Sequence, residues 1–390
     1  MGEADVGSAR AHSRVERWRA RRAMPLCQAP REGLDSRGGA PEMHRRLPVT
    51  VLAGLAAVAV VVAAGAAFAA TAAKKGSVKQ VAIATPAKPS DYGWNQQGYN
   101  AAKTAAAGVG AKFVAQTNIG YDKTESVLRQ LAQGGADFII AHASGYDTIA
   151  GRIAQQLKVP VMTYDIPTQL TKGYVSNITT SSQQGSYLAG ILAARMTKTK
   201  HVGIVISASD TNWYKMSGGF VAGVKSVNKS IKISFVTVSS AGYDDSAGGK
   251  RVVTSVIATG ADVIFGMGDG ASFGYLQGIE TAKAGHKVWF IGDIGSMGPI
   301  DKRHVLLSSV LWSFTSAFKQ AISDIQANKY GTRGYNLTLS NGGISLLKTR
   351  YIPANVWKQI TTARGRITSG KLKVPLTTKA GQVKALIKKK

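Results

Sequence analysis

The sequence predicts an α/β protein whose parallel strands are connected by helices. After residue 80, short apolar segments rich in β-branched and aromatic residues alternate with longer segments of helical apolar spacing. Continuous apolar runs are typical of parallel strands buried on both faces, and their alternation with helices is typical of right-handed crossovers. About 300 residues of this pattern exceed one ordinary domain, so we expect two similar lobes.

The predicted elements follow one another in order along the chain. The strands are expected at Val81–Ala84, Lys112–Gln116, Phe138–His142, Pro160–Tyr164, Val202–Ser207, Lys232–Val238, Val263–Met267, Val288–Gly292 and Val305–Leu311. The helices are expected at Tyr99–Ala107, Lys123–Gly134, Thr148–Leu157, Ser182–Thr197, Ser217–Asn228, Gly249–Gly260 and Phe273–Ala284. The strands are assigned because their apolar segments are short, and the helices are assigned because their apolar residues recur at helical spacing.

The amino-terminal residues are typical of a targeting segment rather than of a folded domain. Residues 1–42 are rich in arginine and lack apolar periodicity, so we treat them as a doubtful leader. From Met43, a short basic segment precedes the charge-free stretch Leu47–Ala73, which is the layout of a secretory signal. Because this stretch is also long enough to span a bilayer, 43–73 is either a cleaved signal or a retained anchor. We expect the body of the protein outside the cytoplasm, in a periplasm or at the outer face of the plasma membrane.

The charge of the chain is strongly positive, with 49 basic and 21 acidic residues and a net charge of +28. A nucleic-acid-binding protein should cluster its basic residues with aromatics or on a recognition helix. Here they are scattered over predicted helix exteriors and gathered in a terminal basic tail, 377–390. We therefore expect association with an anionic membrane surface and no nucleic-acid partner. The single cysteine, Cys27, lies in the leader, so the body needs no disulfide.

A candidate ligand-binding loop follows the first predicted strand and contains Asp91-Tyr92-Gly93-Trp94-Asn95-Gln96. Open α/β sheets place their ligand crevices beyond the carboxyl ends of strands, where this loop lies. Trp94 is expected to stack on a ring, while Asp91 and Asn95 hydrogen-bond its polar edge. A tryptophan after a strand is often part of the core, but Gly93 and Asn95 beside it favour a site for a small polar ring compound.

Further candidates occupy the later strand ends and loops. Asp165 and Asp293 terminate apolar strands, where a carboxylate can accept two hydroxyl groups or, equally naturally, cap a helix. Gly270 would let the backbone approach a ligand, although a turn alone also explains it. Tyr146 and Trp213 lie in loops of suitable polarity without a firm motif.

A series of short segments occurs in the order in which a known family carries them. They are Asp91–Asn95, Tyr187–Gly190, Lys200–Ile204, Gly219–Lys225, Gly260–Ile264, Ile291–Asp293 and Ile367–Pro375. Together, over roughly residues 79–376, they resemble the basic-membrane-protein family of ABC-transporter substrate-binding proteins, whose best-understood members are purine-nucleoside receptors. The resemblance implies the type I periplasmic-binding fold, in which two doubly wound lobes are joined by three crossovers and close on a ligand by hinge motion.

The resemblance also implies a division into lobes and a set of partners. The crossovers would fall near Tyr174–Asn177, Val310–Trp312 and Tyr335–Ser340. Lobe 1 would comprise 79–177 plus 312–337, and lobe 2 would comprise 178–311 plus 338–376. A monomer with a small-molecule ligand, a permease and an ATPase as partners, and no cofactor, is expected.

Three residues receive a role from the resemblance. Asp293 would hold a ribose diol, and Tyr243 would cover the second face of the ligand ring. Trp312 stands where the family commonly has a lysine that reaches the sugar. A different nucleoside, a free base or another ring compound is therefore an open alternative, with Trp312 stacked on it.

Functions of other classes fit the sequence less well. Gly270-Ala271-Ser272-Phe273-Gly274 matches the nucleophile elbow of serine hydrolases, and Asp293 and His304 follow in the triad order. However, Gly268-Asp269 separate the motif from its strand, the spacings are short, and no upstream His-Gly-Gly run offers oxyanion donors. The remaining alternatives are a sugar-binding receptor and a sensory receptor of the same fold. We expect a binding protein for a purine nucleoside or related compound, not an enzyme.

Overall fold

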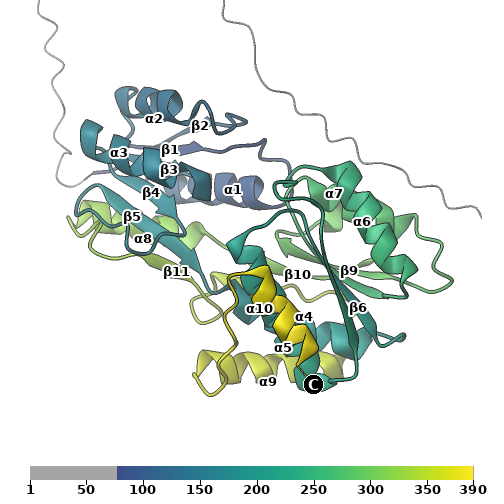
Figure 1. Ribbon diagram of the computed structural model, residues 1–390. Coiled ribbons are helices and arrows are strands. Elements are labelled where there is room, and N and C mark those ends of the chain that lie inside the picture. Colours follow the sequence, from purple (N-terminus) through teal and green to yellow (C-terminus); the bar gives the residue numbers. More distant parts are fainter. Residues whose placement is uncertain (1–76, 390) are drawn as a thin grey trace, which may run out of the picture. The chain divides into compact units, whose positions relative to one another are not determined.

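Two six-stranded sheets organise residues 77–389, the part of the chain that the computed structural model describes (Figure 1). The first sheet has the strand order β11-β5-β4-β3-β1-β2, and the second has the order β12-β10-β9-β8-β6-β7. Strand β12 runs antiparallel to β10, and the other neighbouring strands run parallel. The predicted α/β class with two parallel-strand lobes is confirmed.

The first lobe is built on the first sheet. Its strands are β1 (Gln80–Ala84), β2 (Lys112–Gln116), β3 (Phe138–Ala141), β4 (Val161–Tyr164), β5 (Val175–Thr180) and β11 (Tyr335–Leu337). Its helices are α1 (Trp94–Ala107), α2 (Thr124–Gln133), α3 (Asp147–Leu157) and α8 (Thr315–Gln326). Val81 and Ile83 belong to the core cluster that contains α1 and α8, whereas Ala82 and Ala84 belong to the cluster beneath α2 and α3. Both faces of the sheet are covered, which explains the continuous apolar strands.

The second lobe repeats this layering on the second sheet. Its strands are β6 (His201–Ile206), β7 (Lys232–Thr237), β8 (Val263–Met267), β9 (Trp289–Ile294), β10 (Leu306–Trp312) and β12 (Ile344–Leu346). Helices α4 (Ser182–Met196) and α5 (Thr211–Val227) lie on one face, and α6 (Ser246–Ala258) and α7 (Ala271–Glu280) lie on the other. Helix α9 (Ala354–Thr368) packs on α4, and α10 (Ala380–Lys388) packs on α5.

The chain passes between the two sheets three times, after β5, after β10 and after β11. The first passage was expected near Tyr174–Asn177, and in the structure the chain leaves the first sheet a few residues later, after Thr180 at the end of β5. The other two passages follow Trp312 and Leu337. The terminal segment 377–389 contains α10, whose Val383 is fully buried against the rest of the second lobe.

Two helices begin earlier than their apolar spacing predicted. Helix α1 was expected from Tyr99 but begins at Trp94, because the Asp91 carboxylate accepts the backbone N–H groups of Gly93, Asn95 and Gln96. Helix α5 was expected from Ser217 but begins at Thr211, where the Asp210 carboxylate accepts two backbone N–H groups. A capping carboxylate satisfies donors that have no partner inside the helix, and it thereby extends each helix toward the sheet edge.

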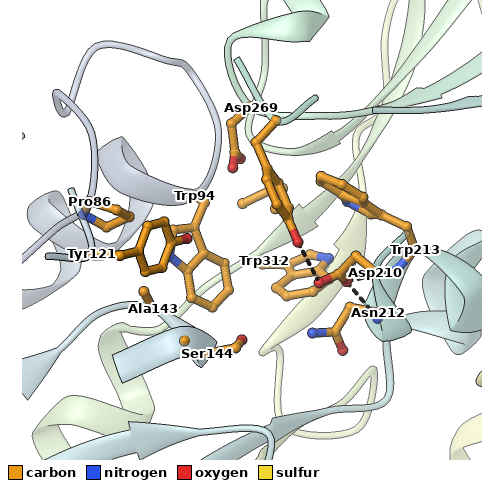
Figure 2. Close-up of a pocket in the computed structure, with 13 residues that line it drawn as sticks. Pro86, Trp94, Tyr121, Ala143, Ser144, Asp210, Asn212, Trp213, Asp269 and Trp312 are labelled. Carbon is orange, nitrogen blue, oxygen red and sulfur yellow. Dashed lines mark hydrogen bonds between the residues drawn. The ribbon is translucent and has the colours of Figure 1, made fainter. Parts of the chain in front are cut away.

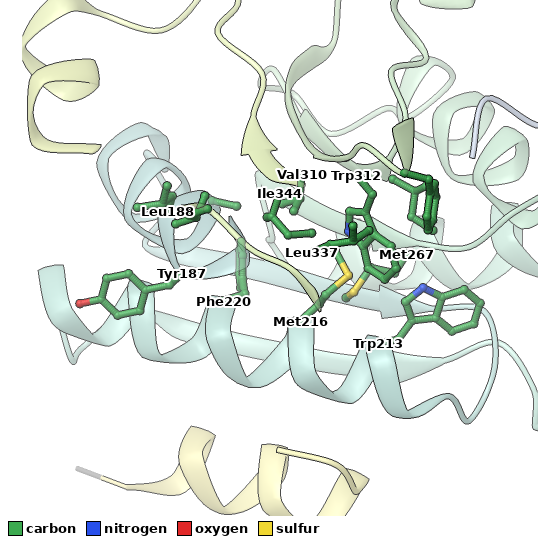
Figure 3. Close-up of a cluster of buried hydrophobic side chains, with 14 of the residues drawn as sticks. Tyr187, Leu188, Trp213, Met216, Phe220, Met267, Val310, Trp312, Leu337 and Ile344 are labelled. Carbon is green, nitrogen blue, oxygen red and sulfur yellow. The ribbon is translucent and has the colours of Figure 1, made fainter. Parts of the chain in front are cut away.

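The buried cluster that contains Val81 and Ile83 continues from the first lobe into the second, and Figure 3 shows part of it beneath the site. Met216 and Phe220 of α5 pack in it with Met267 at the end of β8. Trp213 and Trp312 belong to the same cluster and are only 4% and 3% exposed. Both indoles are therefore held by a close-packed core, which restricts their motion.

Among residues 77–389, none of the helices combines the length and the apolar character required to cross a bilayer. The leader at 1–42 and the signal or anchor expected at 43–73 lie outside the described residues.

Candidate functional site

A cavity of about 260 Å³ lies where the carboxyl ends of the strands of both sheets meet (Figure 2). The first lobe lines it with Pro86, Trp94, Tyr121, Ala143, Ser144 and Gly145. The second lobe lines it with Asp210, Asn212, Trp213, Tyr243, Asp269, Ile294 and Trp312. Ligand crevices of open α/β sheets lie in this position. Its volume falls just below the roughly 300–1,000 Å³ of sites for drug-sized molecules, which favours a small ligand.

Trp94 is fixed in orientation by the first lobe before any ligand arrives. Its ring stacks on His142 with centroids 4.4 Å apart and planes 18° apart, and its Nε1 donates to the His142 carbonyl oxygen at 2.9 Å. The ring nitrogen Nδ1 of His142 lies 2.6 Å from the Tyr164 hydroxyl. Burial lowers the pKa of His142 to about 3, so the imidazole beneath Trp94 is neutral at physiological pH.

Trp213 is fixed in the same manner by the second lobe. Its Nε1 donates to Asp293 Oδ2 at 3.2 Å, and the backbone N–H of Gly268 donates to Asp293 Oδ1 at 3.4 Å. Its ring contacts Tyr243, with centroids 5.1 Å apart and planes tilted by 43°. The predicted residue Asp293 therefore stands behind the cavity wall and positions an aromatic ring that faces the cavity.

Of the ten predicted site residues, four line the cavity: Trp94, Trp213, Tyr243 and Trp312. Asp91 and Asn95 do not, because their side chains bond each other at 2.7 Å and hold the start of α1. The amide oxygen of Asn95, Oδ1, accepts the backbone N–H of Ala87 at 3.3 Å. This pair therefore shapes the loop that carries Trp94.

The other three predicted residues also lie behind the lining. The Tyr146 side chain is fully buried, and its hydroxyl donates to the Gly120 carbonyl oxygen. Asp165 Oδ2 accepts the Ser144 hydroxyl at 2.5 Å and the Asn212 amide at 3.0 Å, so it orients two residues that do line the cavity. The Gly270 N–H donates to Asp244.

Sequence reasoning missed several lining residues. Asp210 and Asp269 lie in the connections that follow β6 and β8, a few residues beyond the strand ends at which Asp165 and Asp293 were singled out. Tyr121 lies in the connection between β2 and α2, where no residue pattern marks it, and reaches the cavity mouth with 53% of its surface exposed.

The segment that matches the serine-hydrolase motif, Gly270–Gly274, does not have the geometry of a nucleophile elbow. Ser272 lies inside α7 and is 5% exposed, and its hydroxyl donates to the Gly268 carbonyl oxygen. Within residues 77–389, no hydrogen bond joins this hydroxyl to a histidine, and His304 lies on an exposed turn. The same residues contain no cluster of side chains suited to a metal ion.

The buried Asp293 carboxyl predicts a pH-dependent loss of stability. Removal from water raises the pKa of Asp293 to about 8, against the effect of the hydrogen bonds from Gly268 and Trp213. Between about pH 4 and pH 8 the folded protein therefore holds a proton that the unfolded chain releases, so rising pH disfavours folding. We expect Asp293→Asn to flatten this dependence. Urea denaturation at a series of pH values measures it.

Asp324 provides a control of opposite sign. Burial raises its pKa, but hydrogen bonds from Tyr335, Gln320 and Arg333 outweigh that effect and lower the pKa. Its stabilising contribution is present above the ordinary carboxyl pKa and fades as the pH falls, so Asp324→Asn should cost most near neutrality. If the difference in unfolding free energy between wild type and Asp293→Asn stays constant from pH 5 to pH 8, the protonation of Asp293 is refuted.

Comparison with known proteins agrees with this architecture. The family model for the "ABC transporter substrate-binding protein PnrA-like" family matches residues 78–377. The "ABC transporter nucleoside-binding protein BmpA" of Lactococcus lactis subsp. cremoris is 26% identical over 216 residues, which are 52% of this chain and 60% of that protein. The aligned part thus spans less than two thirds of this relative.

Solved structures show the same fold. A solute-binding protein of an ABC transporter system from Aeropyrum pernix K1 superposes with a TM-score of 0.68 at 19% identity, covering 78% of this chain and 95% of the other. A periplasmic solute-binding protein from Actinobacillus succinogenes 130z with bound D-allose gives 0.53 at 16% identity, covering 69% and 97%. These likenesses concern the fold, whereas the family model covers most of the chain. The protein belongs to the Bmp family of PnrA-like ABC transporter substrate-binding proteins.

Proposed function

We propose that this protein is the receptor subunit of an ABC importer and captures a purine nucleoside or a related ring compound between its two lobes. The observation that carries the proposal is the cavity at the carboxyl ends of both sheets, which has tryptophan rings from each lobe in its walls. Trp94 comes from the first lobe, and Trp213 and Trp312 come from the second.

Binding in this site requires little rearrangement of the aromatic walls. His142 holds Trp94 and Asp293 holds Trp213, so the ligand does not have to order these rings on arrival. Preorganisation of this kind retains more of the interaction energy as affinity. Stacking of a base on an aromatic ring is worth about 1–3 kcal/mol. Ser144 and Asn212, both oriented by Asp165, offer polar groups for the edge of the ligand.

The lobes would close on the ligand by hinge motion at the three chain passages, and the closed form would dock on a membrane permease driven by an ATPase. We expect the protein to act as a monomer outside the cytoplasm. This expectation rests on family membership and on the signal-like sequence at 43–73. The named activity of the Lactococcus relative supports the nucleoside class.

A sugar is the second candidate ligand, because the Actinobacillus protein of the same fold holds D-allose. The hydrogen-bonded group of Ser144, Asn212 and Asp165 could receive hydroxyl groups, and aromatic rings also pack on sugar faces. Calorimetry against nucleosides, free bases, pentoses and hexoses separates the two. Tight binding of a sugar alone would move the assignment to the sugar class.

Trp94→Ala tests the site directly. Loss of the stacking face is expected to weaken binding of the best nucleoside by at least about tenfold. Trp289→Ala is the control, since Trp289 packs on Tyr351 away from the cavity and should leave the Kd unchanged. Loss of the stacking interaction should cost more than about 1 kcal/mol of binding free energy. If the Kd of Trp94→Ala stays within about twofold of wild type, the ligand binds elsewhere. Ester hydrolysis that disappears in Ser272→Ala would instead support the hydrolase alternative.

A further inference from the structure

We propose that the ligand of this cavity carries a positive charge, as a quaternary or protonated nitrogen, held among the aromatic rings and opposite Asp210 and Asp269. This inference rests on the proposed receptor function and specifies its ligand class. It separates the ligand from neutral nucleosides and neutral sugars.

The carboxyl-bearing and basic side chains that line the cavity are all of the acidic kind. Asp210 and Asp269 are lining residues, and no lysine or arginine is found among the described residues that line the cavity. Directly behind the lining stand Asp165, which holds Ser144 and Asn212, and Asp293, which holds Trp213 and keeps its proton below about pH 8. This acidic surround lies within a chain whose net charge is +28, so it is a local feature of the site.

Two further charged groups complete the surround. The Asp244 carboxylate accepts the Gly270 N–H at 3.1 Å beside Asp269. The Lys215 ammonium donates to Asn212 Oδ1 at 3.1 Å. Burial raises the pKa of Asp210 and the charge of Asp165 adds to the rise, while the N–H groups of Asn212 and Trp213 and the charge of Lys215 oppose it. One ammonium group therefore faces several carboxylates, and the field inside the cavity favours a cation.

Asp269 gives an independent indication, because one of its carboxyl oxygens is buried and lacks a hydrogen-bond partner in the described part of the chain. Its Oδ1 is inaccessible to solvent and has no hydrogen-bond partner within residues 77–389. Figure 2 shows its carboxylate directed toward the space between Trp94 and Trp312. Burial raises the pKa of Asp269 well above its ordinary value, and the charges of Asp91, Asp293 and Asp244 add to the rise, while the backbone N–H of Trp94 opposes it. A cationic ligand would supply the missing partner and stabilise the ionised form.

The aromatic walls are suited to the same charge. Trp94, Trp213, Trp312, Tyr121 and Tyr243 surround the cavity. Cations bind over the faces of such rings, most strongly over tryptophan, and quaternary ammonium groups are recognised by cages of this kind. The Trp312 Nε1 is a buried donor without a partner in the described part of the chain, so the ligand should also carry one hydrogen-bond acceptor. A cationic ring with a carbonyl or hydroxyl group meets both requirements.

Matched pairs of probes test the proposal, each pair having one cationic and one neutral member of similar shape. They are 1-methylnicotinamide with nicotinamide, choline with 3,3-dimethylbutan-1-ol, and 1-methyladenosine with adenosine. Calorimetry would use the full chain, refolded in mild detergent to release any ligand carried through purification. At least one cationic member is expected to bind about tenfold or more tightly than its neutral partner.

Variants locate the origin of that preference. Asp269→Asn and Asp210→Asn should each reduce the preference for the cationic member severalfold, whereas Trp94→Ala should weaken both members of the pair. Asp122→Asn removes an exposed carboxylate outside the cavity lining and should change neither. Circular dichroism checks that each variant is folded. If a variant does not fold, the difference in affinity between cationic and neutral probes for the wild-type chain decides whether the ligand is a cation.

The possible results separate this inference from the receptor function. If adenosine binds as tightly as 1-methyladenosine, and the cationic member of neither other pair binds more tightly than its neutral partner, the cationic ligand is refuted. The nucleoside receptor function is not affected by that result. If a cationic member is preferred and Asp269→Asn retains the preference, the assigned carboxylate is wrong. Absence of binding by every probe contradicts the cation proposal, while binding of a sugar unaffected by Trp94→Ala contradicts the proposed function and its site.

Discussion

Gly223→Ala is expected to destabilise the protein by about 3 kcal/mol. A Cβ atom at Gly223 in α5 would lie 2.1 Å from the backbone oxygen of Tyr187 in α4 and 3.0 Å from the Cα of Gly190. The converse holds on α4, where a Cβ at Gly190 would lie 2.2 Å from the Phe220 oxygen. Backbone atoms cannot rotate away as side chains do, so the two helices would have to separate along their contact.

The helix propensity of alanine works against this effect but is too small to cancel it. Alanine favours a helix over glycine by roughly 1 kcal/mol. Gly365→Ala in α9 is the matched control, because a Cβ there would meet no atom within 4 Å. It should stabilise the protein by about 0.5–1 kcal/mol, and the two variants should therefore differ in sign. Urea denaturation measures both free energies of unfolding, and equal values for the two variants would refute close α4–α5 packing.

Gly295→Ala is expected to weaken ligand binding by at least about tenfold while leaving the thermal stability of the unliganded protein nearly unchanged. Gly295 follows β9 in the second lobe, and a Cβ there would lie 1.9 Å from the backbone oxygen of Tyr92 in the first lobe. It would also lie 2.8 Å from Gln97 Nε2. The clash thus falls between the lobes, so each lobe can fold normally while their approach around the cavity is blocked.

Gly298→Ala is the control for this prediction. It lies in the same connection, and a Cβ there would meet the Ser296 hydroxyl at 3.3 Å and no atom of the first lobe. Calorimetry should give a wild-type Kd for Gly298→Ala and a weaker one for Gly295→Ala, with similar melting temperatures for both. A wild-type Kd for Gly295→Ala would mean that ligand binding does not require this approach of the lobes.

The strands and most helices could be predicted from the sequence because their signals are local. Lys112–Gln116 and Val263–Met267 are bounded in the structure as predicted. All five residues of Val263–Met267 are buried, and a strand buried on both faces needs an uninterrupted apolar run. The segments that were missed include α8 and α9 and the three-residue strands β11 and β12. Strands this short carry too few residues to show a period, and their pairing with β5 and β10 comes from distant parts of the chain.

The aromatic half of the site was also predictable. Trp94, Trp213, Tyr243 and Trp312 line the cavity, and each lies at the carboxyl end of a predicted strand or in the segment that leads from one to the next helix. The position of such a residue along the chain fixes the sheet edge at which it lies. A large aromatic side chain at that edge packs in or beside the crevice that forms there.

Only the tertiary structure decided which polar residues face the cavity. Asp91 lies in the loop after β1 and Asp293 lies at the end of β9, yet one holds the start of α1 and the other holds the indole of Trp213, which is 80 residues away in sequence. Asp269 lies two residues beyond β8 and lines the cavity, and its Oδ1 has no hydrogen-bond partner among residues 77–389. A carboxylate bonds to whichever donors the fold brings within reach. Those donors come from elements far apart in the chain, so no local pattern encodes which aspartate remains available to a ligand.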